Sequence, residues 1–245
     1  MLDSSSTAPR VAIVVTGEPI DSVRAARGGF ANLMREALGA SVAELVTLDA
    51  RPGRLPSLCE FDGVIVTGSA ASVTERAPWI VDTERRLAEC VAAGVYVLGV
   101  CFGHQLLAQA LGGDVQRNPN GREIGSVALS LCADDALLGA AGTQLCVNMT
   151  HVDSVLKLPP RARVLGSTVL DPYAALRFGE RVWGVQFHPE IDAAAMAAYV
   201  KARRAALDGE GLDAAKILGE VEETPASRGV LARFVAEVAG GPRRR

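Results

Sequence analysis

Short apolar runs alternate with longer amphipathic stretches over the first 111 residues of the chain. The apolar runs are rich in Val, Ile and Leu and end in glycine or polar residues, which predicts strands over 11–15, 43–48, 63–66 and 95–100. Between them, apolar residues recur at helical spacing, and we expect helices over 24–38, 79–92 and 102–111. This alternation favours an α/β fold with a mostly parallel sheet and helices on both faces.

The pattern changes after Gly125. Up to about residue 183, strand-like runs follow one another without long helices between them: SVALSL, TQLCV, ARVLGS, AALRF and RVWGV. We expect these runs to be antiparallel additions at the edge of the sheet. Helical periodicity returns over 193–207, 212–221 and 229–238. Since each of these helices is short and has to bury an apolar face, we expect a helical C-terminal cap over 191–240.

The order of these elements predicts one domain over residues 1–245 rather than two small ones. Within it we expect a flexible N-terminus over 1–9 and a solvated tail over 241–245. Ligands of open parallel sheets bind beyond the carboxyl ends of the strands, so the chemistry is expected in the segments that follow the strands.

Composition narrows the choice of partner and compartment. The formal net charge of -3 gives no basic field for a phosphate backbone, which argues against nucleic acid as a partner. The first ten residues contain no apolar signal segment, and no later stretch reaches about 18 uninterrupted apolar residues, which argues against secretion and against a membrane. We expect a cytoplasmic protein.

The five cysteines include no C-x-x-C pair, which argues against a disulfide framework and against a zinc site. A reducing compartment is the simplest interpretation. The three histidines are scattered and no carboxylates cluster near them, so they form a poor ligand set. We therefore expect neither a metal nor a cofactor.

The sharpest chemical feature is the sequence Gly99-Val100-Cys101-Phe102-Gly103, between a predicted strand and a predicted helix. This pattern is typical of a nucleophile elbow with sulfur in place of oxygen, in which the glycines relieve crowding at a sharp turn. The Phe102 N–H is then free to bind an oxyanion, and the helix N-terminus favours a thiolate. On this pattern alone, a buried core cysteine is an equally good interpretation.

A second segment, Gly184 to Glu190 (GVQFHPE), also follows a predicted strand. His188 can act as the base for Cys101, and Glu190 can accept the other imidazole N–H and fix the tautomer of the ring. Standing alone, this segment would be interpreted as a solvated turn.

Together the two segments resemble the signature pair of the class I glutamine amidotransferases, an elbow of the form G-x-C-x-G-x-Q followed later by H-P-E. The TGS at Thr67 to Ser69 and the Gly112-Gly113 pair also match that family. The resemblance extends from the first strand to at least Glu190. The resemblance continues into the C-terminal helices, because free-standing members similar to the amidotransferase domain of GMP synthase, including the γ-glutamyl peptidases, carry comparable helical tails.

This resemblance implies a flavodoxin-like three-layer sandwich. It also implies hydrolysis of glutamine or another γ-glutamyl amide through a γ-glutamyl thioester on Cys101, with His188 and Glu190 completing the catalytic residues. Gly68 and Phe102 match the positions whose backbone N–H groups form the oxyanion hole. Water is the only co-reactant that such a reaction requires.

The resemblance extends to substrate binding. Gln105 matches a family glutamine that helps to hold the substrate. Thr150, His151 and Val152 match a family segment, often S-H-G-D, whose backbone receives the α-amino and α-carboxylate groups. Val152 replaces the usual glycine, so if that glycine has a positive φ, either the loop differs or the substrate is held differently. For His151, a substrate-pocket role and a structural hydrogen-bonding role both stay open.

Two other polar sites receive structural interpretations. We expect His104, within the elbow helix, to be a packed or capping histidine without a catalytic role. Arg122 and Glu123 follow a turn at Asn118 to Gly121, and an exposed hairpin is favoured over contact with the substrate.

Several functions stay open at this stage. The enzyme either degrades a small-molecule γ-glutamyl substrate unaided or supplies ammonia to a separate synthase subunit, because the chain shows no fused synthase and no Walker-type nucleotide loop. A non-catalytic binding or regulatory protein on the same fold is disfavoured by the intact Cys101, His188 and Glu190. A hydrolase or chaperone of the related elbow-bearing superfamily is disfavoured by the H-P-E segment.

Overall fold

The computed structural model of the chain describes residues 8–241. Its strands are β1 (Arg10–Val15), β2 (Glu44–Asp49), β3 (Gly63–Val66), β4 (Tyr96–Val100), β5 (Asp114–Arg117), β6 (Glu123–Leu131), β7 (Gln144–His151), β8 (Asp153–Lys157), β9 (Arg163–Ser167), β10 (Ala175–Gly179) and β11 (Val182–Val185). Its α-helices are α1 (Asp21–Arg27), α2 (Phe30–Leu38), α3 (Pro78–Ala92), α4 (Phe102–Ala110), α5 (Ala193–Ala202), α6 (Arg204–Gly209), α7 (Ala214–Gly219) and α8 (Pro225–Gly240).

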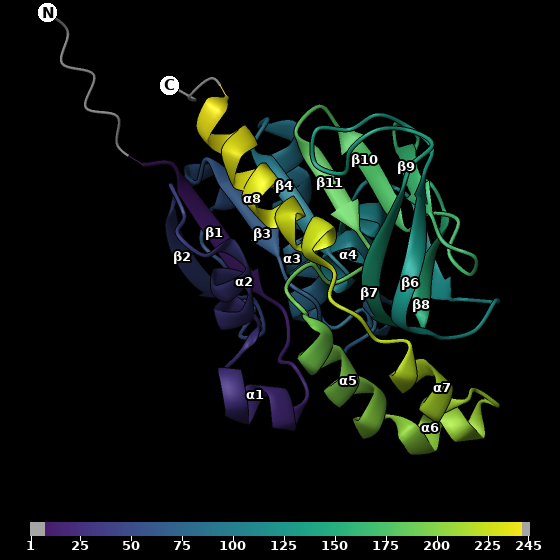
Figure 1. The fold of residues 1–245 in the computed structure, drawn as a ribbon. Helices are drawn as coiled ribbons and strands as arrows, with labels where there is room; N and C mark the ends of the chain where they lie inside the picture. Colours follow the sequence, from purple (N-terminus) through teal and green to yellow (C-terminus); the bar gives the residue numbers. More distant parts are fainter. Residues whose placement is uncertain (1–7, 242–245) are drawn as a thin grey trace, which may run out of the picture.

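A nine-stranded sheet runs through the molecule in the order β2-β1-β3-β4-β11-β10-β9-β6-β7, and β5 pairs with β8 in a small second sheet (Figure 1). The first five strands in that order are mutually parallel. The remaining four continue the sheet in antiparallel pairs. The predicted α/β fold, with a mostly parallel sheet and antiparallel additions, is confirmed.

One strand of the predicted antiparallel group is placed differently. β11, which covers the last four residues of the run RVWGV, is parallel to β4 and lies inside the sheet, so its assignment to the antiparallel edge is wrong. A short apolar run carries no information about the direction of its neighbours, and every residue of β11 is buried, as in an interior parallel strand. As a result, the segment before His188 lies beside the segment before Cys101.

Two predicted helices are interrupted. The helix expected over 24–38 is divided into α1 and α2 at Gly28, whose φ of +81° is costly for any residue with a side chain. The helix expected over 193–207 is divided into α5 and α6 at Arg203. Both breaks lie close to the candidate site described below.

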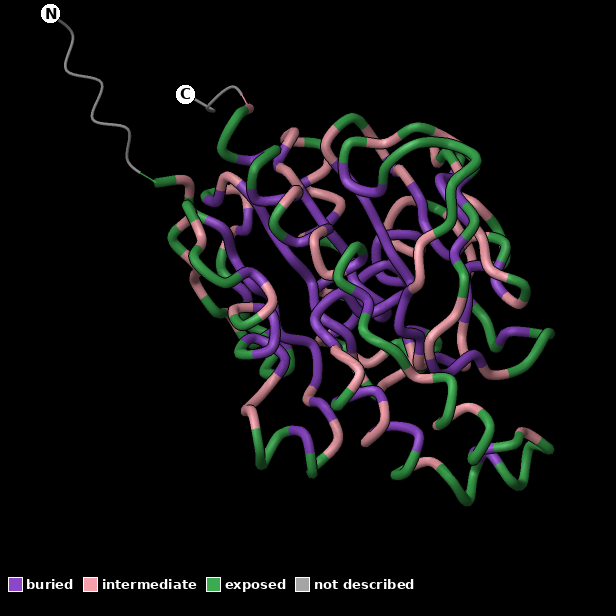
Figure 2. The backbone as a smooth tube through the Cα atoms, in the orientation of Figure 1, coloured by how far each residue is buried: buried purple, intermediate pink, exposed green. Residues whose placement is uncertain are grey.

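Helices cover both faces of the sheet and form the predicted three layers. On one face α2 and α8 bury Met34 and Phe234 against the strands, and on the other α3 and α4 bury Leu87 and Leu106. Figure 2 shows the buried backbone concentrated along the strands between these layers. Because α8 forms part of a layer, the helical extension over 191–240 is more than a cap.

Helices α5, α6 and α7 pack at one end of the sheet, near α1 (Figure 1). Their apolar faces form a third buried cluster, which includes Phe30, Tyr199 and Leu207. The single-domain organisation over 1–245 stays a prediction, and the parts of the expected N-terminus and tail at 1–7 and 242–245 lie outside the described residues. Within 8–241, no helix combines the length and apolar character needed to cross a membrane.

Candidate active site

A strained turn joins β4 to α4 and presents Cys101. Its φ is +51°, a conformation that non-glycine residues rarely adopt. A Cβ at Gly99 would lie 2.4 Å from the Gly103 carbonyl oxygen, and one at Gly103 would lie 2.5 Å from the Val66 carbonyl oxygen. Steric crowding therefore requires both glycines of the predicted elbow.

His188 reaches this turn from the neighbouring strand. Val185 at the end of β11 pairs with Val100, and the Cys101 N–H donates to the Val185 carbonyl oxygen over 2.8 Å. The His188 N–H donates to the Asn148 carbonyl oxygen over 2.9 Å, and the imidazole stacks on Phe30 with a centroid separation of 6.1 Å. Backbone and ring contacts thus hold the imidazole beside the elbow.

Glu190 is hydrogen-bonded to the far side of that ring. The distance between His188 Nδ1 and Glu190 Oε1 is 2.7 Å, and the two residues are 2% and 0% exposed. Burial alone would lower the pKa of His188, but the charges of Glu190 and Cys101, together with hydrogen bonding to both, raise it to about 10. The imidazole is therefore protonated at neutral pH, between two groups that carry or can develop negative charge.

Gly68 lies against both Cys101 and His188. A Cβ at Gly68 would approach His188 Cε1 to 2.7 Å and Cys101 Cβ to 3.7 Å, so the absence of a side chain leaves room for the imidazole. The Gly68 backbone is thus adjacent to the Cys101 side chain, as an oxyanion donor has to be. The Phe102 N–H belongs to the first turn of α4, where no intrahelical carbonyl is available to accept from it.

Thr16, directly after β1, fixes the two peptide groups on either side of Gly68. Its hydroxyl lies 2.9 Å from the Thr67 carbonyl oxygen and 3.0 Å from the Gly68 carbonyl oxygen. The Thr67 hydroxyl accepts from the Thr16 N–H over 3.1 Å. All three residues belong to segments that follow parallel strands. The hydrogen bond to the Thr67 carbonyl oxygen fixes the peptide plane that also carries the Gly68 N–H.

Two cavities open beside these residues. The Cys101 cavity, of about 220 Å³, is lined by Cys101 and Gln105, and the His188 cavity, of about 520 Å³, is lined by His188, Phe30 and Tyr199. The walls of both include Ser69, Ala70, Thr150 and Arg203. A substrate bound at the sulfur can therefore extend from one cavity towards the other.

Gln105 and Thr150 differ in their freedom to bind a ligand. The Gln105 side-chain NH₂ donates to the Asp153 carbonyl oxygen over 2.8 Å and to Gln186 Oε1 over 3.0 Å. The Thr150 hydroxyl is buried and has no hydrogen-bond partner within residues 8–241. A buried hydroxyl left in this state is costly unless a ligand satisfies it, and Thr150 lines both cavities.

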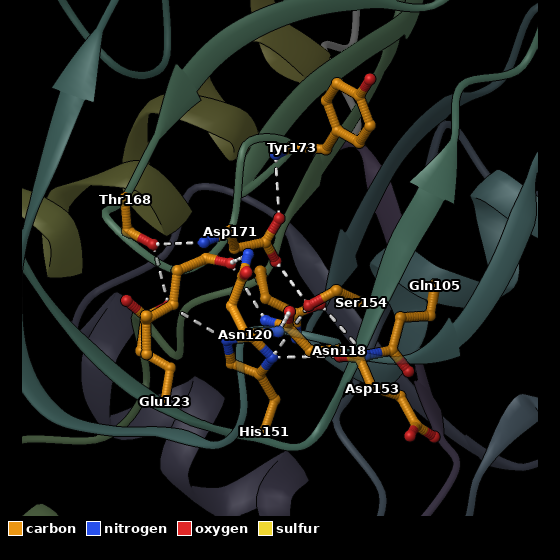
Figure 3. A network of polar contacts seen from close by, with 12 residues as sticks. Gln105, Asn118, Asn120, Glu123, His151, Asp153, Ser154, Thr168, Asp171 and Tyr173 are labelled. Carbon is orange, nitrogen blue, oxygen red and sulfur yellow. Dashed lines mark hydrogen bonds and ion pairs between the residues drawn. The ribbon is translucent and has the colours of Figure 1, made fainter.

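His151 lines the Cys101 cavity, but its ring nitrogens contact protein groups (Figure 3). Nε2 lies 3.2 Å from Glu123 Oε2, and Nδ1 lies 3.0 Å from the Asp153 carbonyl oxygen. Ser154 and Thr168 extend this network behind the cavity wall. The geometry favours the structural hydrogen-bonding role for the imidazole.

Val152 joins β7 to β8 without a positive φ. Within the described residues, positive φ outside glycine occurs at Arg76 and Cys101. The Val152 carbonyl oxygen accepts from the Asn118 N–H over 2.8 Å. A β-branched residue therefore follows this path without left-handed strain.

The favoured interpretation of Arg122 and Glu123 as an exposed hairpin is wrong. Glu123 is buried because it pairs with His151, and Arg122 forms a bidentate pair with Glu210, at 2.8 and 2.9 Å. Arg122 also lines the Cys101 cavity. A charged pair beside a turn gives no signal of these partners, which come from distant segments.

His104 lies behind the site in the way expected of a packed histidine. It is fully buried, packs against Phe178 at a centroid distance of 5.8 Å, and burial lowers its pKa to about 3. The ring is therefore neutral and serves packing. Within residues 8–241, His, Cys, Asp and Glu side chains do not gather in a group of three that could hold a metal ion.

A family model described as glutamine amidotransferase class-I matches residues 32–203. The chain belongs to the class-I glutamine amidotransferase family. This confirms the resemblance found in the sequence and the predicted enzyme type, a glutamine amidotransferase.

Curated relatives of this amidotransferase chain include two bacterial or archaeal proteins named GMP synthase [glutamine-hydrolyzing]. The one from Aeropyrum pernix is 37% identical over 150 residues, which cover 61% of this chain and 28% of that protein. The one from Staphylococcus carnosus is 38% identical over 130 residues, which cover 53% of this chain and 24% of that protein. The aligned region thus spans about a quarter of the length of these relatives.

Solved structures share the fold of this amidotransferase. A glutamine amidotransferase from Thermotoga maritima has a TM-score of 0.73 at 22% identity, with 96% of this chain and 100% of that chain covered. A glutamine amidotransferase from Methylobacillus flagellatus has a TM-score of 0.71 at 21% identity, with 95% and 94% covered. The flavodoxin-like architecture predicted from the family resemblance is confirmed.

Sequence analysis misses several residues around the amidotransferase site. The local pattern marks Thr16 only as the end of a strand, and Arg203 as part of a continuous helix. Thr16 contributes through side-chain partners that are distant in the sequence, and Arg203 lines both cavities. The signal available for Thr16 is its place at the carboxyl end of a parallel strand, where ligands of such sheets gather.

Proposed function

We propose that the chain hydrolyses glutamine or another γ-glutamyl amide through a γ-glutamyl thioester on Cys101. The observation that carries this proposal is the buried imidazole of His188, which is hydrogen-bonded to Glu190 and lies beside the strained Cys101 turn. A raised imidazole pKa supports a sulfur nucleophile, because the protonated ring stabilises a neighbouring thiolate and holds a proton for the leaving group.

The first half of the reaction forms the thioester. The Cys101 thiolate attacks the γ-carbonyl carbon, and the carbonyl electrons move to oxygen, where the Gly68 and Phe102 N–H groups stabilise the negative charge. Collapse of this intermediate breaks the C–N bond. The leaving nitrogen takes the proton of the His188 imidazolium and departs as ammonia or an amine.

The second half releases glutamate. The now neutral imidazole accepts a proton from water as the water oxygen attacks the thioester carbon, and the C–S bond then breaks. The Cys101 thiolate and the His188 imidazolium are restored together. Glu190 holds the ring in one tautomer and compensates its charge in both halves.

We assign substrate binding to the Cys101 cavity. The Thr150 hydroxyl supplies an unsatisfied polar group, and Gln105 lines the wall beside the sulfur. The backbone at His151 and Val152 lies at the same wall, as the family resemblance implies for the α-amino and α-carboxylate groups. We further propose that one domain over 1–245 carries this site.

The His188 cavity favours amide substrates larger than glutamine. His188 protonates the leaving nitrogen, so the leaving amine lies on the His188 side of the sulfur. A volume of about 520 Å³ falls in the range of cavities that bind organic ligands and far exceeds what ammonia needs. We therefore favour the unaided hydrolysis of γ-glutamyl amines or peptides.

A second candidate is the supply of ammonia to a separate synthase subunit. It is supported by the similarity to part of the proteins named GMP synthase [glutamine-hydrolyzing]. A dedicated supplier is expected to be weak alone and stimulated by its synthase, whereas a catabolic hydrolase turns over γ-glutamyl amides unaided.

Labelling by a glutamine-analogue diazo-ketone tests the shared mechanism. We expect one equivalent to attach at Cys101, as located by peptide mass spectrometry, and to disappear in Cys101→Ala. Glutamate release from glutamine and from γ-glutamyl amines is measured in parallel. Absent labelling and absent glutamate release would support the non-catalytic alternative, and an active His188→Asn variant would support the elbow-bearing hydrolases with another histidine partner.

A further inference from the structure

Arg203 lies at the junction of α5 and α6 and lines both the Cys101 cavity and the His188 cavity. Its backbone N–H is anchored to the Tyr199 carbonyl oxygen over 3.1 Å, and its guanidinium carbon lies 4.8 Å from the centroid of the Tyr199 ring. Since Tyr199 is itself buried, this contact holds the cation against the cavity wall.

Among the described residues, the guanidinium of Arg203 forms no ion pair with a carboxylate. Its Nη1 atom is buried without a hydrogen-bond partner, and no carboxylate within residues 8–241 lies at ion-pair distance from it. Burial lowers its pKa, and the positive charge of Arg122 adds to that effect, while Tyr199 and Cys101 act in the opposite direction. A guanidinium does not lose its proton in proteins, so this charge remains and is costly until an anion meets it.

The other charged groups of the cavity walls are engaged. Arg122 is paired with Glu210 through two contacts. The wall carboxylates have partners of their own: Glu18 with Arg51, Asp21 with Arg24, Glu75 with the Ser72 N–H, and Asp153 with the Ser72 hydroxyl. Arg203 is thus the cation left to interact with whatever enters the space that the two cavities share.

We propose that Arg203 binds a carboxylate of the γ-glutamyl substrate and thereby selects anionic substrates. This inference rests on the proposed γ-glutamyl amide hydrolysis. The carboxylate has two sources: the α-carboxylate of the γ-glutamyl group, or a carboxylate on the amine part, as in a γ-glutamyl peptide. Arg203 lines the cavities on both sides of the sulfur and can meet either source.

Four substrates distinguish binding of the α-carboxylate from binding of a carboxylate on the amine part. Glutamine and 4-aminobutanamide differ by the α-carboxylate alone. γ-Glutamylglycine carries a carboxylate on the leaving amine where γ-glutamylethylamide carries a methyl group. We measure kcat and KM for all four with the wild-type chain, with Arg203→Met and with Arg203→Lys.

If Arg203 binds the α-carboxylate, Arg203→Met is expected to lower kcat/KM about 10- to 100-fold for the three γ-glutamyl substrates, because a charged hydrogen bond is lost. The kcat/KM for 4-aminobutanamide, which has no α-carboxylate, should stay nearly unchanged. If Arg203 instead binds the carboxylate of the leaving amine, Arg203→Met should lower kcat/KM for γ-glutamylglycine alone, to the value for γ-glutamylethylamide. Arg203→Lys, which keeps charge but not the planar fork, recovers part of the loss.

The neighbouring Arg204 provides a matched control. Its side chain is 72% exposed, pairs with Asp208 at 3.8 Å and does not line either cavity, so Arg204→Met is expected to leave all four kcat/KM values unchanged. Equal loss on all four substrates with Arg203→Met would assign Arg203 a purely structural role. A wild-type chain that does not discriminate within either pair would also overturn the inference, even if the variant fails to fold.

A binding measurement separates this inference from the proposed function. Calorimetric titration of γ-glutamylglycine and glutamine into Cys101→Ala, with and without Arg203→Met, reports recognition without turnover. Weaker binding in the double variant supports the inference even if no substrate is hydrolysed. Unchanged binding together with active wild-type enzyme would overturn the role of Arg203 and leave the hydrolysis intact.

Discussion

Single side chains around Cys101 act mainly through the backbone that they hold. The Thr16 hydroxyl contacts the carbonyl oxygens of both Thr67 and Gly68, and so fixes the peptide group that carries the Gly68 N–H, the proposed oxyanion donor. A donor of this kind stabilises charge that develops only in the transition state. Its positioning is therefore expected to affect turnover more than substrate binding.

Thr16→Val removes that hydroxyl at nearly constant volume. We expect kcat for glutamate release to fall about 10-fold with KM nearly unchanged, less than the about 10²- to 10³-fold loss of a whole donor. Thr16→Ser, which keeps the hydroxyl, should restore most of kcat. A rise in KM at constant kcat would show that Thr16 shapes substrate binding and not the oxyanion site.

The charge of Glu190 is expected to control the protonation of His188. Burial opposes the raised pKa of about 10, so once Glu190→Gln removes the carboxylate, the pKa of His188 should fall by several units. NMR titration of the imidazole Cε1 proton measures it. His104, with a pKa of about 3, should stay neutral in both proteins and serves as the internal reference.

The same pKa predicts how stability depends on pH. The folded-state pKa of His188, about 10, lies above its usual 6.5, so its protonation stabilises the fold fully below about pH 6.5. That contribution is lost as the pH rises through 10. Denaturant unfolding should therefore show a wild-type advantage over Glu190→Gln that shrinks between these values. An advantage that grows with pH would contradict the assignment.

At the scale of elements, β11 and α8 decide where the site residues lie. Trp183 of β11 packs edge-on against Phe234 of α8, with a centroid separation of 6.1 Å and an interplanar angle of 86°. Both side chains are nearly fully buried in the layer formed by α2 and α8. The last helix thus supports the strand that leads to His188.

Phe234→Ala is expected to remove about 3 to 5 kcal/mol from the free energy of unfolding, because it leaves a cavity against β11. Urea unfolding followed by circular dichroism measures the loss. The control is Glu237→Ala on the exposed side of α8, which should change the free energy by less than about 0.5 kcal/mol. Equal effects of the two substitutions would show that α8 is not packed as described.

The elements with strong local patterns are predictable from the sequence. The strand runs at 11–15 and 63–66, the elbow and the H-P-E segment all have patterns tied to local geometry or to a family motif. The position of β11 beside β4 is not predictable, since a four-residue apolar run fits an edge or an interior strand equally. Pairings such as Arg122 with Glu210 depend on tertiary packing and leave no local signature.

At the scale of the whole molecule, the candidate site collects segments from most of the described chain. Thr16 and Gly68 follow β1 and β3, Cys101 follows β4, and His188 follows β11. Arg203 comes from the helical extension at the same end of the sheet. Carboxyl ends of parallel strands meet at one edge, which explains why the motif residues converge.

The insertion of β11 next to β4 also has a consequence for the newly made protein. The thiol at position 101 is synthesised before the imidazole at 188, and β11 can take its place between β4 and β10 only after it has been made. Until then no imidazole lies beside the sulfur. The proposed reaction therefore requires the finished sheet and is not expected of the growing polypeptide.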